Sequence, residues 1–221
     1  MLDNIIAFMA PHYCCGCDKI GSLLCDDCKY NITSESVLRC VACGRPTANM
    51  SLCLSCRTPY ERAWVVGERS GVLQRLIGLY KFERARAGFD PLADLLARSL
   101  PDLPVDVVVV PVPTVASHIR ERGYDHMLLI SKRFAKKRNL KLERLLCRKT
   151  NTKQRQASSG KRNMQAKAAF GVRGVVSPDK VYLVMDDVIT TGATIKYATK
   201  ALRGAGAKHV WVAAIARQPL G

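Results

Sequence analysis

The cysteines restrict this chain more than any other feature of its sequence. Eight of the ten stand as four Cys-x-x-Cys pairs. A two-residue spacer lets both sulfurs of a pair reach one tetrahedral ion, and two pairs complete a closed four-cysteine site of the structural zinc type. The rival interpretation, a disulfide framework, belongs to secreted proteins. The sequence therefore predicts Zn²⁺ held by Cys14, Cys17, Cys25, Cys28, Cys40, Cys43, Cys53 and Cys56.

The cysteine block repeats itself, which bears on how the pairs share ions. The segments "CCGCDKIGSLLCDDC" and "CVACGRPTANMSLCLSC" have the same order of a pair, a turn with Gly or Pro, Leu-Cys and a second pair. The simplest partition is sequential and gives two zinc ions, although a cross-braced pairing stays open at this point. A region this short cannot bury much core, so bound metal would supply its folding free energy. We expect residues 1–58 to form a zinc-binding domain.

The charge balance favours a polyanionic partner. The chain has 35 Lys plus Arg and 18 Asp plus Glu, a formal net charge of +17. Sixteen Lys or Arg and only three acids lie between residues 117 and 167. This excess suits nucleic acid or a phosphorylated substrate, and it does not choose between them. No apolar stretch approaches the ~18 residues of a membrane-spanning helix, and the first apolar run follows Asp3 without a basic region. We therefore expect no membrane insertion and a cytoplasmic location.

From residue 59 onward the pattern is that of a parallel α/β domain. The run "DVVVVPV" at 106–112 is nearly all β-branched, which is typical of a parallel strand covered on both faces. Strands that alternate with amphipathic helices predict a parallel sheet with flanking helices. Residues 59–104 would form an N-terminal part, the hood, and 105–221 the core. We expect strands at 63–67, 106–112, 181–185 and 209–215, and helices at 71–80, 91–100, 125–137 and 193–203.

The segment "VYLVMDDVITTGAT" carries the strongest local signal. Asp186 and Asp187 end a hydrophobic strand at its carboxyl edge, where open α/β sheets bind ligands. The residues that follow enter a helix and offer hydroxyls and backbone N–H groups at its positive end, which makes a cradle for phosphate. The neighbouring acids can accept hydrogen bonds from sugar hydroxyls, so a phosphorylated sugar such as ribose 5-phosphate fits. The cradle consists of Thr190, Thr191, Gly192, Ala193 and Thr194.

This segment resembles the phosphoribosyl pyrophosphate (PRPP) motif of type I phosphoribosyltransferases. With the four-pair cysteine block in front, the whole chain resembles the ComF family, amidophosphoribosyltransferase-like proteins linked to DNA uptake in naturally competent bacteria. Further matches are "PVP" at 111–113, "RERGY" at 120–124, Gln154, Arg162 and "AF" at 169–170. The chain departs from the family at Asp125-His126, where Asn-Gln is usual, and at Ala157 and Gln165.

The resemblance implies a type I phosphoribosyltransferase fold that binds PRPP with Mg²⁺. Asp186 and Asp187 would hold the ribose hydroxyls, and residues 190–194 would bind the 5-phosphate. Pro113 and Thr114 would belong to a pyrophosphate loop, with Arg120 and Arg122 beside it as catalytic cations. Residues 153–167 would form a lid over the reacting centre.

Two functional classes follow from these features. The first is an enzyme that transfers a phosphoribosyl group from PRPP to a nitrogen nucleophile. The second is a non-catalytic factor that handles single-stranded DNA during uptake, together with other competence proteins, in which the PRPP pocket is a sensor or a relic. Outside these motifs, Lys81 is expected on the surface, with a place in the pocket, reached from the hood, as the alternative, and His126 is expected in a structural role.

Overall fold

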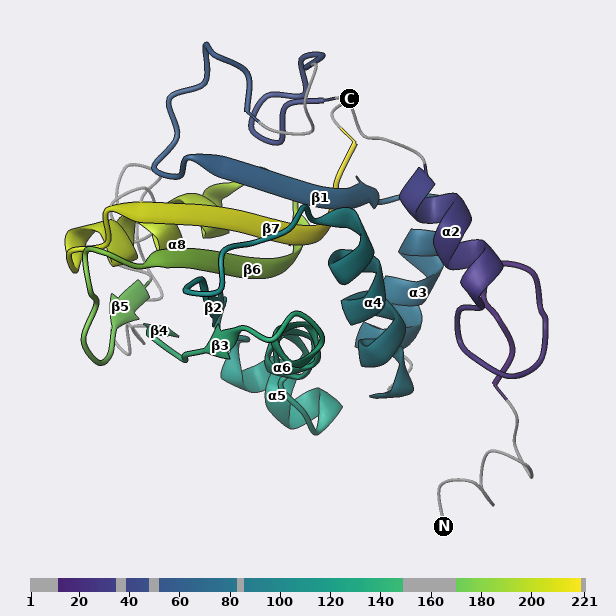
Figure 1. Ribbon diagram of the computed structural model, residues 1–221. Helices are drawn as coiled ribbons and strands as arrows, with labels where there is room; N and C mark the ends of the chain where they lie inside the picture. Colours follow the sequence, from purple (N-terminus) through teal and green to yellow (C-terminus); the bar gives the residue numbers. More distant parts are fainter. Residues whose placement is uncertain (1–11, 35–38, 48–51, 83–85, 149–169, 220–221) are drawn as a thin grey trace, which may run out of the picture.

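A five-stranded sheet forms the centre of the computed structural model, which describes residues 12–34, 39–47, 52–82, 86–148 and 170–219. All neighbouring strands of this sheet are parallel, in the order β1-β7-β6-β2-β3 (Figure 1). The predicted fold class, a parallel sheet with flanking helices preceded by a small cysteine-rich part, is confirmed. The strands are β1 (Arg62–Glu68), β2 (Val108–Pro111), β3 (Lys141–Leu142), β6 (Val181–Ile189) and β7 (His209–Arg217), and a separate antiparallel pair joins β4 (Leu146–Arg148) to β5 (Phe170–Val172).

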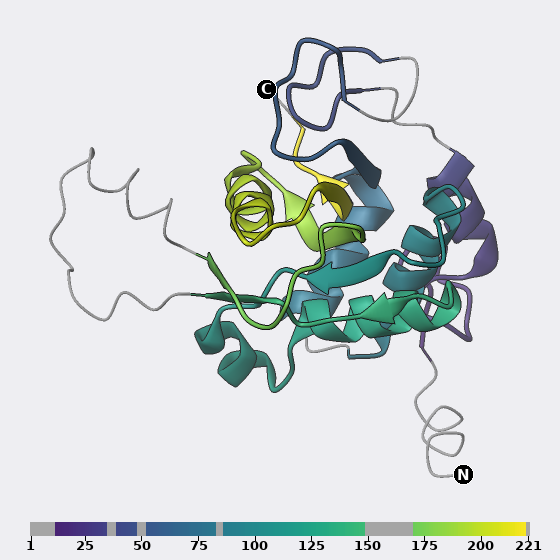
Figure 2. The same cartoon turned by 60° about the vertical axis from the view of Figure 1, so that its left-hand side comes forward.

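Helices cover both faces of the sheet, because successive side chains of each buried strand point to opposite faces. On one face α3, α4 and α6 pack against strand residues such as Leu183. On the other face α8 packs against residues such as Val184, and Figure 2 shows this helix across the sheet from the teal helices. Among the described residues, every helix is too short or too polar to cross a membrane. The helices are α2 (Asp26–Ser34), α3 (Gly71–Phe82), α4 (Phe89–Ser99), α5 (Ala116–Arg122), α6 (His126–Lys137) and α8 (Ala193–Gly204), with a 3₁₀ turn η1 (Arg86–Gly88).

The order of the strands determines where a ligand can bind. After β2 the chain passes through α6 to β3, and after β6 it passes through α8 to β7, on the opposite face and in the opposite direction along the sheet. The neighbours β2 and β6 therefore flank a topological switch point, and their carboxyl ends border a crevice. The segments "PVPT" and "DDV" follow or end these two strands.

The two halves of the cysteine-rich part pack on opposite faces of the sheet. In the first half, Cys14 and Leu24 are buried in the same hydrophobic core as residues of α3 and α4. The Lys29 ammonium lies 3.0 Å from the Asp94 carboxylate of α4. In the second half, Val41 joins the core on the α8 side. The two halves are thus in different environments despite their similar sequences.

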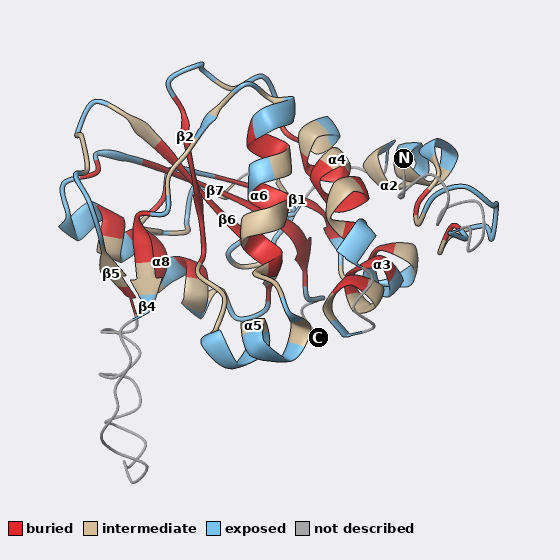
Figure 3. Cartoon of the chain, turned by 90° about the horizontal axis from the view of Figure 1, so that it is seen from below, coloured by how far each residue is buried: buried red, intermediate tan, exposed pale blue. Residues whose placement is uncertain are grey.

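The secondary structure differs from the expectations in several places, among them the short strands β3, β4 and β5, which were not expected. The strand expected at 181–185 extends to Ile189, because β6 keeps its pairing with β7 through Asp186 and Val188. Helix α5 was not expected, and none of its residues is buried, so its sequence carries no amphipathic signal. Figure 3 shows α5 in the colours of exposed and half-buried residues.

Candidate functional site

A cavity of about 340 Å³ opens at the carboxyl ends of β2 and β6, at the switch point of the sheet. Its walls come from five parts of the chain: the end of α3, the residues after β2, α5 with the start of α6, β4, and the end of β6 with α8. Acidic and cationic side chains both face it. The lining residues are Lys81, Phe82, Val112, Pro113, Thr114, Val115, His118, Glu121, Arg122, His126, Met127, Arg148, Asp186, Asp187, Val188 and Thr194.

Asp186 and Asp187 are both 9% exposed, yet they have opposite electrostatic environments. Burial, and then the charge of Asp187, raise the pKa of Asp186 to about 7. Burial would raise the pKa of Asp187 too, but the hydrogen bond from His126 and the charge of Lys81 hold it well below its usual range. Near neutral pH the pair thus offers one firmly ionised carboxylate and one that is easily protonated.

Two side chains from outside the motif hold Asp187. The Lys81 ammonium lies 2.5 Å from Asp187 Oδ2, and the His126 Nε2 lies 2.6 Å from the same oxygen. The expectation that Lys81 is a surface lysine was wrong, because its side chain is 17% exposed and turns into the cavity. His126, expected in a structural role, also lines the cavity. The sequence signal for Lys81 was only its place at the end of an amphipathic helix.

Arg148 is a cation of the cavity that sequence reasoning missed. Its Nε donates to the Pro113 carbonyl at 2.8 Å, and its guanidinium lies 5.0 Å from the centre of the Phe170 ring. This arrangement places a positive charge beside the residues that follow β2. In the sequence Arg148 is one of many basic residues in its segment, so nothing distinguished it.

The structure places most of the predicted site residues around two different cavities. One group lines the cavity, namely Pro113, Thr114, Arg122, Asp186, Asp187 and Thr194. A second group, namely Thr190, Thr191 and Gly192, lines a neighbouring cavity. Ala193 lines neither of these two cavities, and the lid at 153–167 lies outside the described residues.

The two arginines expected beside the pyrophosphate loop lie in different environments. Arg120 is exposed and does not line the cavity, whereas Arg122 does. Both lie on α5, and helix positions two apart face different directions. Only one of the two arginines can therefore point inward.

The loop between β6 and α8 retains the properties of a phosphate cradle. Gly192 is the N-cap of α8 with φ 75°, a left-handed conformation that favours glycine. Gly192 has no side chain to cap this helix start, and the N–H of Ala193 makes only a long hydrogen bond to the Thr191 hydroxyl, at 3.4 Å. Such an end attracts an anion.

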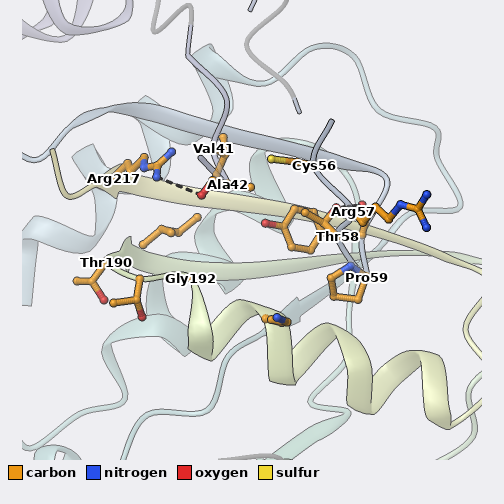
Figure 4. A pocket seen from close by; sticks show the side chains of 13 residues that line it. Val41, Ala42, Cys56, Arg57, Thr58, Pro59, Thr190, Gly192 and Arg217 are labelled. Atoms are coloured by element: carbon orange, nitrogen blue, oxygen red, sulfur yellow. Dashed lines mark hydrogen bonds between the residues drawn. The ribbon is translucent and has the colours of Figure 1, made fainter. Parts of the chain in front are cut away.

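A second cavity, of about 210 Å³, separates this loop from the second half of the cysteine-rich part (Figure 4). The buried Arg217, at the end of β7, donates hydrogen bonds to the carbonyls of Cys40 and Ala42. The next residue, Gln218, donates its N–H to the Ile189 carbonyl at 2.8 Å. The end of β7 therefore connects the second cysteine group to the start of the phosphate loop.

The eight paired cysteines form two clusters in which all four sulfurs lie within 4.8 Å of one another. The clusters are Cys14, Cys17, Cys25, Cys28 and Cys40, Cys43, Cys53, Cys56, which is the sequential partition. Four thiolates at ~2.3 Å from a tetrahedral ion are about 3.8 Å apart. The observed sulfur separations of 3.6 Å (Cys17–Cys25), 3.5 Å (Cys43–Cys53) and 3.9 Å (Cys40–Cys56) agree with this geometry.

Backbone groups are arranged to stabilise thiolates in both clusters. The sulfur of Cys14 accepts from the N–H groups of Gly16 and Cys25, both at 3.4 Å, and the sulfur of Cys40 accepts from the N–H of Cys53 at 3.3 Å. Although burial raises the pKa of Cys14, these hydrogen bonds lower it to about 6. Each cluster could hold one zinc ion.

Comparison with known proteins finds one relative that is similar to this chain over most of its length. No family model matches the chain. The chain is 27% identical to competence protein F of Haemophilus influenzae over 208 residues. This alignment covers 88% of the chain and 90% of the relative. The chain is a homologue of competence protein F. Because the ComF-like match covers 88% of the chain, it takes in most of the α/β part and at least part of the cysteine-rich part.

Solved structures similar to the ComF-like chain include phosphoribosyltransferases. The glutamine PRPP amidotransferase of B. subtilis, complexed with ADP and GMP, has 22% identity and a TM-score of 0.44 over 63% of this chain. The chain spans 30% of that amidotransferase. A purine phosphoribosyltransferase of Pyrococcus horikoshii has 18% identity and a TM-score of 0.39, over 59% of this chain and 74% of the other.

Proposed function

We propose that the chain binds PRPP with Mg²⁺ in the cavity between β2 and β6 and transfers its phosphoribosyl group to a nitrogen nucleophile. The observation that carries this proposal is the buried Asp186–Asp187 pair, which lies at the switch point between cationic side chains and the uncapped start of α8. A sugar with phosphate groups at two ends needs this combination of acceptors and cations.

The residues suggest a division of roles along the ligand. Asp186 and Asp187 would accept hydrogen bonds from the ribose hydroxyls, and the start of α8 would bind the 5-phosphate. The cations Lys81, Arg122 and Arg148 would surround the pyrophosphate, whose negative charge increases as the bond to the sugar breaks. Enclosure between α5, β4 and the sheet would limit the access of water to the reacting carbon.

The donor set of the cavity fits a Mg²⁺ ion that arrives with its ligand. Within the described residues no three acidic or histidine side chains outside the cysteine clusters converge as a preformed cation site. Mg²⁺ typically retains substrate phosphates and waters as ligands and needs only one or two carboxylates. Asp186 would supply this carboxylate, since no salt bridge to it is formed by the described residues. When bound, Mg²⁺ would neutralise charge on the pyrophosphate.

Ligand-induced stabilisation tests the proposal. PRPP with Mg²⁺ at about a hundredfold its Kd should stabilise the protein by about 2.7 kcal/mol, which raises the melting temperature of a chain of this size by roughly 5–10 °C. Differential scanning fluorimetry measures this shift. The double variant Asp186→Asn with Asp187→Asn should lose it, and ribose 5-phosphate alone should give a smaller shift. The absence of any shift with PRPP and Mg²⁺ would contradict the proposal.

The alternative function, a factor that handles single-stranded DNA with a pocket that senses PRPP, is favoured by the net charge of +17 and by the name of the competence relative. In this case an oligonucleotide should bind with an affinity that falls by at least tenfold between about 50 mM and 200 mM salt, because bound cations are released from the phosphates. Fluorescence anisotropy measures this dependence. Binding that persists in the same Asp186 and Asp187 double variant would separate this function from the pocket, and salt-independent or absent binding would exclude it.

A further inference from the structure

His126 lies at the meeting point of three elements that surround the cavity. Its side chain is 8% exposed. Nε2 lies 2.6 Å from Asp187 Oδ2 on β6, and Nδ1 lies 3.0 Å from Arg122 Nη1 on α5. The Thr114 hydroxyl, in the loop after β2, lies 3.1 Å from the same Nδ1. The ring therefore touches an acid and a cation that belong to opposite sides of the cavity.

These contacts determine which ring nitrogen carries the proton. A guanidinium can only donate hydrogen bonds, so Nδ1 must accept from Arg122. The single proton of the Thr114 hydroxyl goes to Asp125 Oδ1 at 2.7 Å and does not compete for Nδ1. A neutral imidazole with Nδ1 as acceptor carries its proton on Nε2, where it donates to the Asp187 carboxylate.

We propose that His126 is a positioning residue that ties Asp187 to Arg122 through one neutral imidazole. The acid that would hold the sugar and the arginine that would meet the pyrophosphate are then kept at a constant separation. This inference rests on the proposed function for the identity of the ligand. The tie itself depends only on the donor and acceptor roles of three side chains.

Protonation of His126 would break the tie on one side only. The Nδ1–H of an imidazolium would face the N–H groups of Arg122, and two positive charges would adjoin. The groups that face the ring are Asp187 of β6, Arg122 of α5, the Thr114 hydroxyl and Tyr80 of α3, whose ring centre lies 6.4 Å away. Lys81 contacts Asp187, and Asp125 accepts a hydrogen bond from Thr114, so both lie one contact further from the ring. A neutral imidazole is therefore the form of the ring that fits both Asp187 and Arg122.

A matched pair of variants tests the proposal. The amide of His126→Gln has one acceptor and one donor and can serve both partners, whereas His126→Leu has neither. Calorimetric titration with PRPP and Mg²⁺ at about pH 8 should show affinity within about threefold of the wild type for Gln and a loss of about 10- to 100-fold for Leu. Equal losses in both variants, or wild-type affinity in the Leu variant, would refute the positioning role.

A direct observation of the tautomer keeps the inference testable if PRPP does not bind at all. The ¹⁵N spectrum of histidine-labelled protein contains four side chains, and the His126 signal is identified by its absence in His126→Gln. An Nε2–H tautomer that becomes mixed in Arg122→Leu supports the tie, and an Nδ1–H tautomer contradicts it. Wild-type protein that shows this tautomer but binds no PRPP would refute the proposed function alone. If His126→Leu does not fold, Arg122→Leu removes the contact between Arg122 and His126 by a change at Arg122, which is only half-buried.

Discussion

Asp186→Asn should raise the melting temperature at about pH 8, and Asp187→Asn, one residue later, should lower it. Burial and the charge of Asp187 raise the pKa of Asp186 to about 7, from an ordinary value of 3.8. A carboxyl whose pKa is higher in the folded state destabilises the fold once it ionises, and this cost grows between about pH 4 and pH 7. An amide removes the charge, so we expect a gain of about 1–3 kcal/mol.

The opposite sign for Asp187 follows from its partners. Its pKa is held below the usual range by the hydrogen bond from His126 and the charge of Lys81, despite its burial. The stabilisation is present above the unfolded pKa and is lost as the pH falls through the folded value. Asp187→Asn leaves the Lys81 ammonium, 17% exposed, without its counter-ion, which should cost about 2–4 kcal/mol.

Thermal denaturation followed by circular dichroism at several pH values measures both effects. The gain from Asp186→Asn should shrink towards about pH 5, because the wild-type carboxyl is then protonated in the fold. The exposed Asp179 gives a control variant, Asp179→Asn, that should stay within about 0.5 kcal/mol of the wild type. A shift of the same sign for both acids would show that the environment assigned to them is wrong.

The sequence predicted the pair of acids but not the difference between them. The motif at 181–194 predicts a strand, two carboxylates and a phosphate cradle, because each of these depends on neighbouring residues in the chain. The state of each carboxylate depends on Lys81 and His126, which come from helices far away in the sequence. Periodicity identifies the buried face of such helices but does not indicate which polar residue at a helix end turns inward.

The two arginines of "RERGY" also show that the sequence does not predict which polar side chain turns inward. As a linear motif both looked equivalent, and both were expected beside the pyrophosphate loop. Once α5 forms, only Arg122 faces His126 and the cavity, while Arg120 is exposed. A helix without a single buried residue leaves no hydrophobic pattern from which its orientation could be predicted.

The cysteine partition could be predicted because it depends on a local repeat. Each half contains two pairs and a turn, and the structure brings the same four sulfurs together in each half. What the repeat could not indicate is that the halves pack on opposite faces of the sheet. The first packs beside α3 and α4, and the second borders the phosphate loop through the smaller cavity.

The second large effect is expected when zinc is removed from the two cysteine clusters. Purified protein should contain two zinc ions per chain, one for each cluster. Structural zinc contributes ~10–16 kcal/mol in small zinc-finger peptides, which is comparable to the whole stability of a typical domain, so loss of an ion should unfold its half of the cysteine-rich part. Mass spectrometry of the metal content and circular dichroism during chelation measure these changes. A protein with one ion or none would contradict the two-site assignment.

Matched cysteine variants should separate the two sites by their effect on the ligand. Cys17→Ser with Cys25→Ser and Cys43→Ser with Cys53→Ser should each remove one ion. Only the second pair should weaken PRPP binding, by about tenfold, because loss of the second cluster releases the Cys40 carbonyl from Arg217 and loosens the chain end that holds Ile189 at the start of the phosphate loop. Unchanged PRPP affinity in the second variant would mean that the connection through β7 carries no coupling, and that the second zinc site stabilises only its own half of the cysteine-rich part.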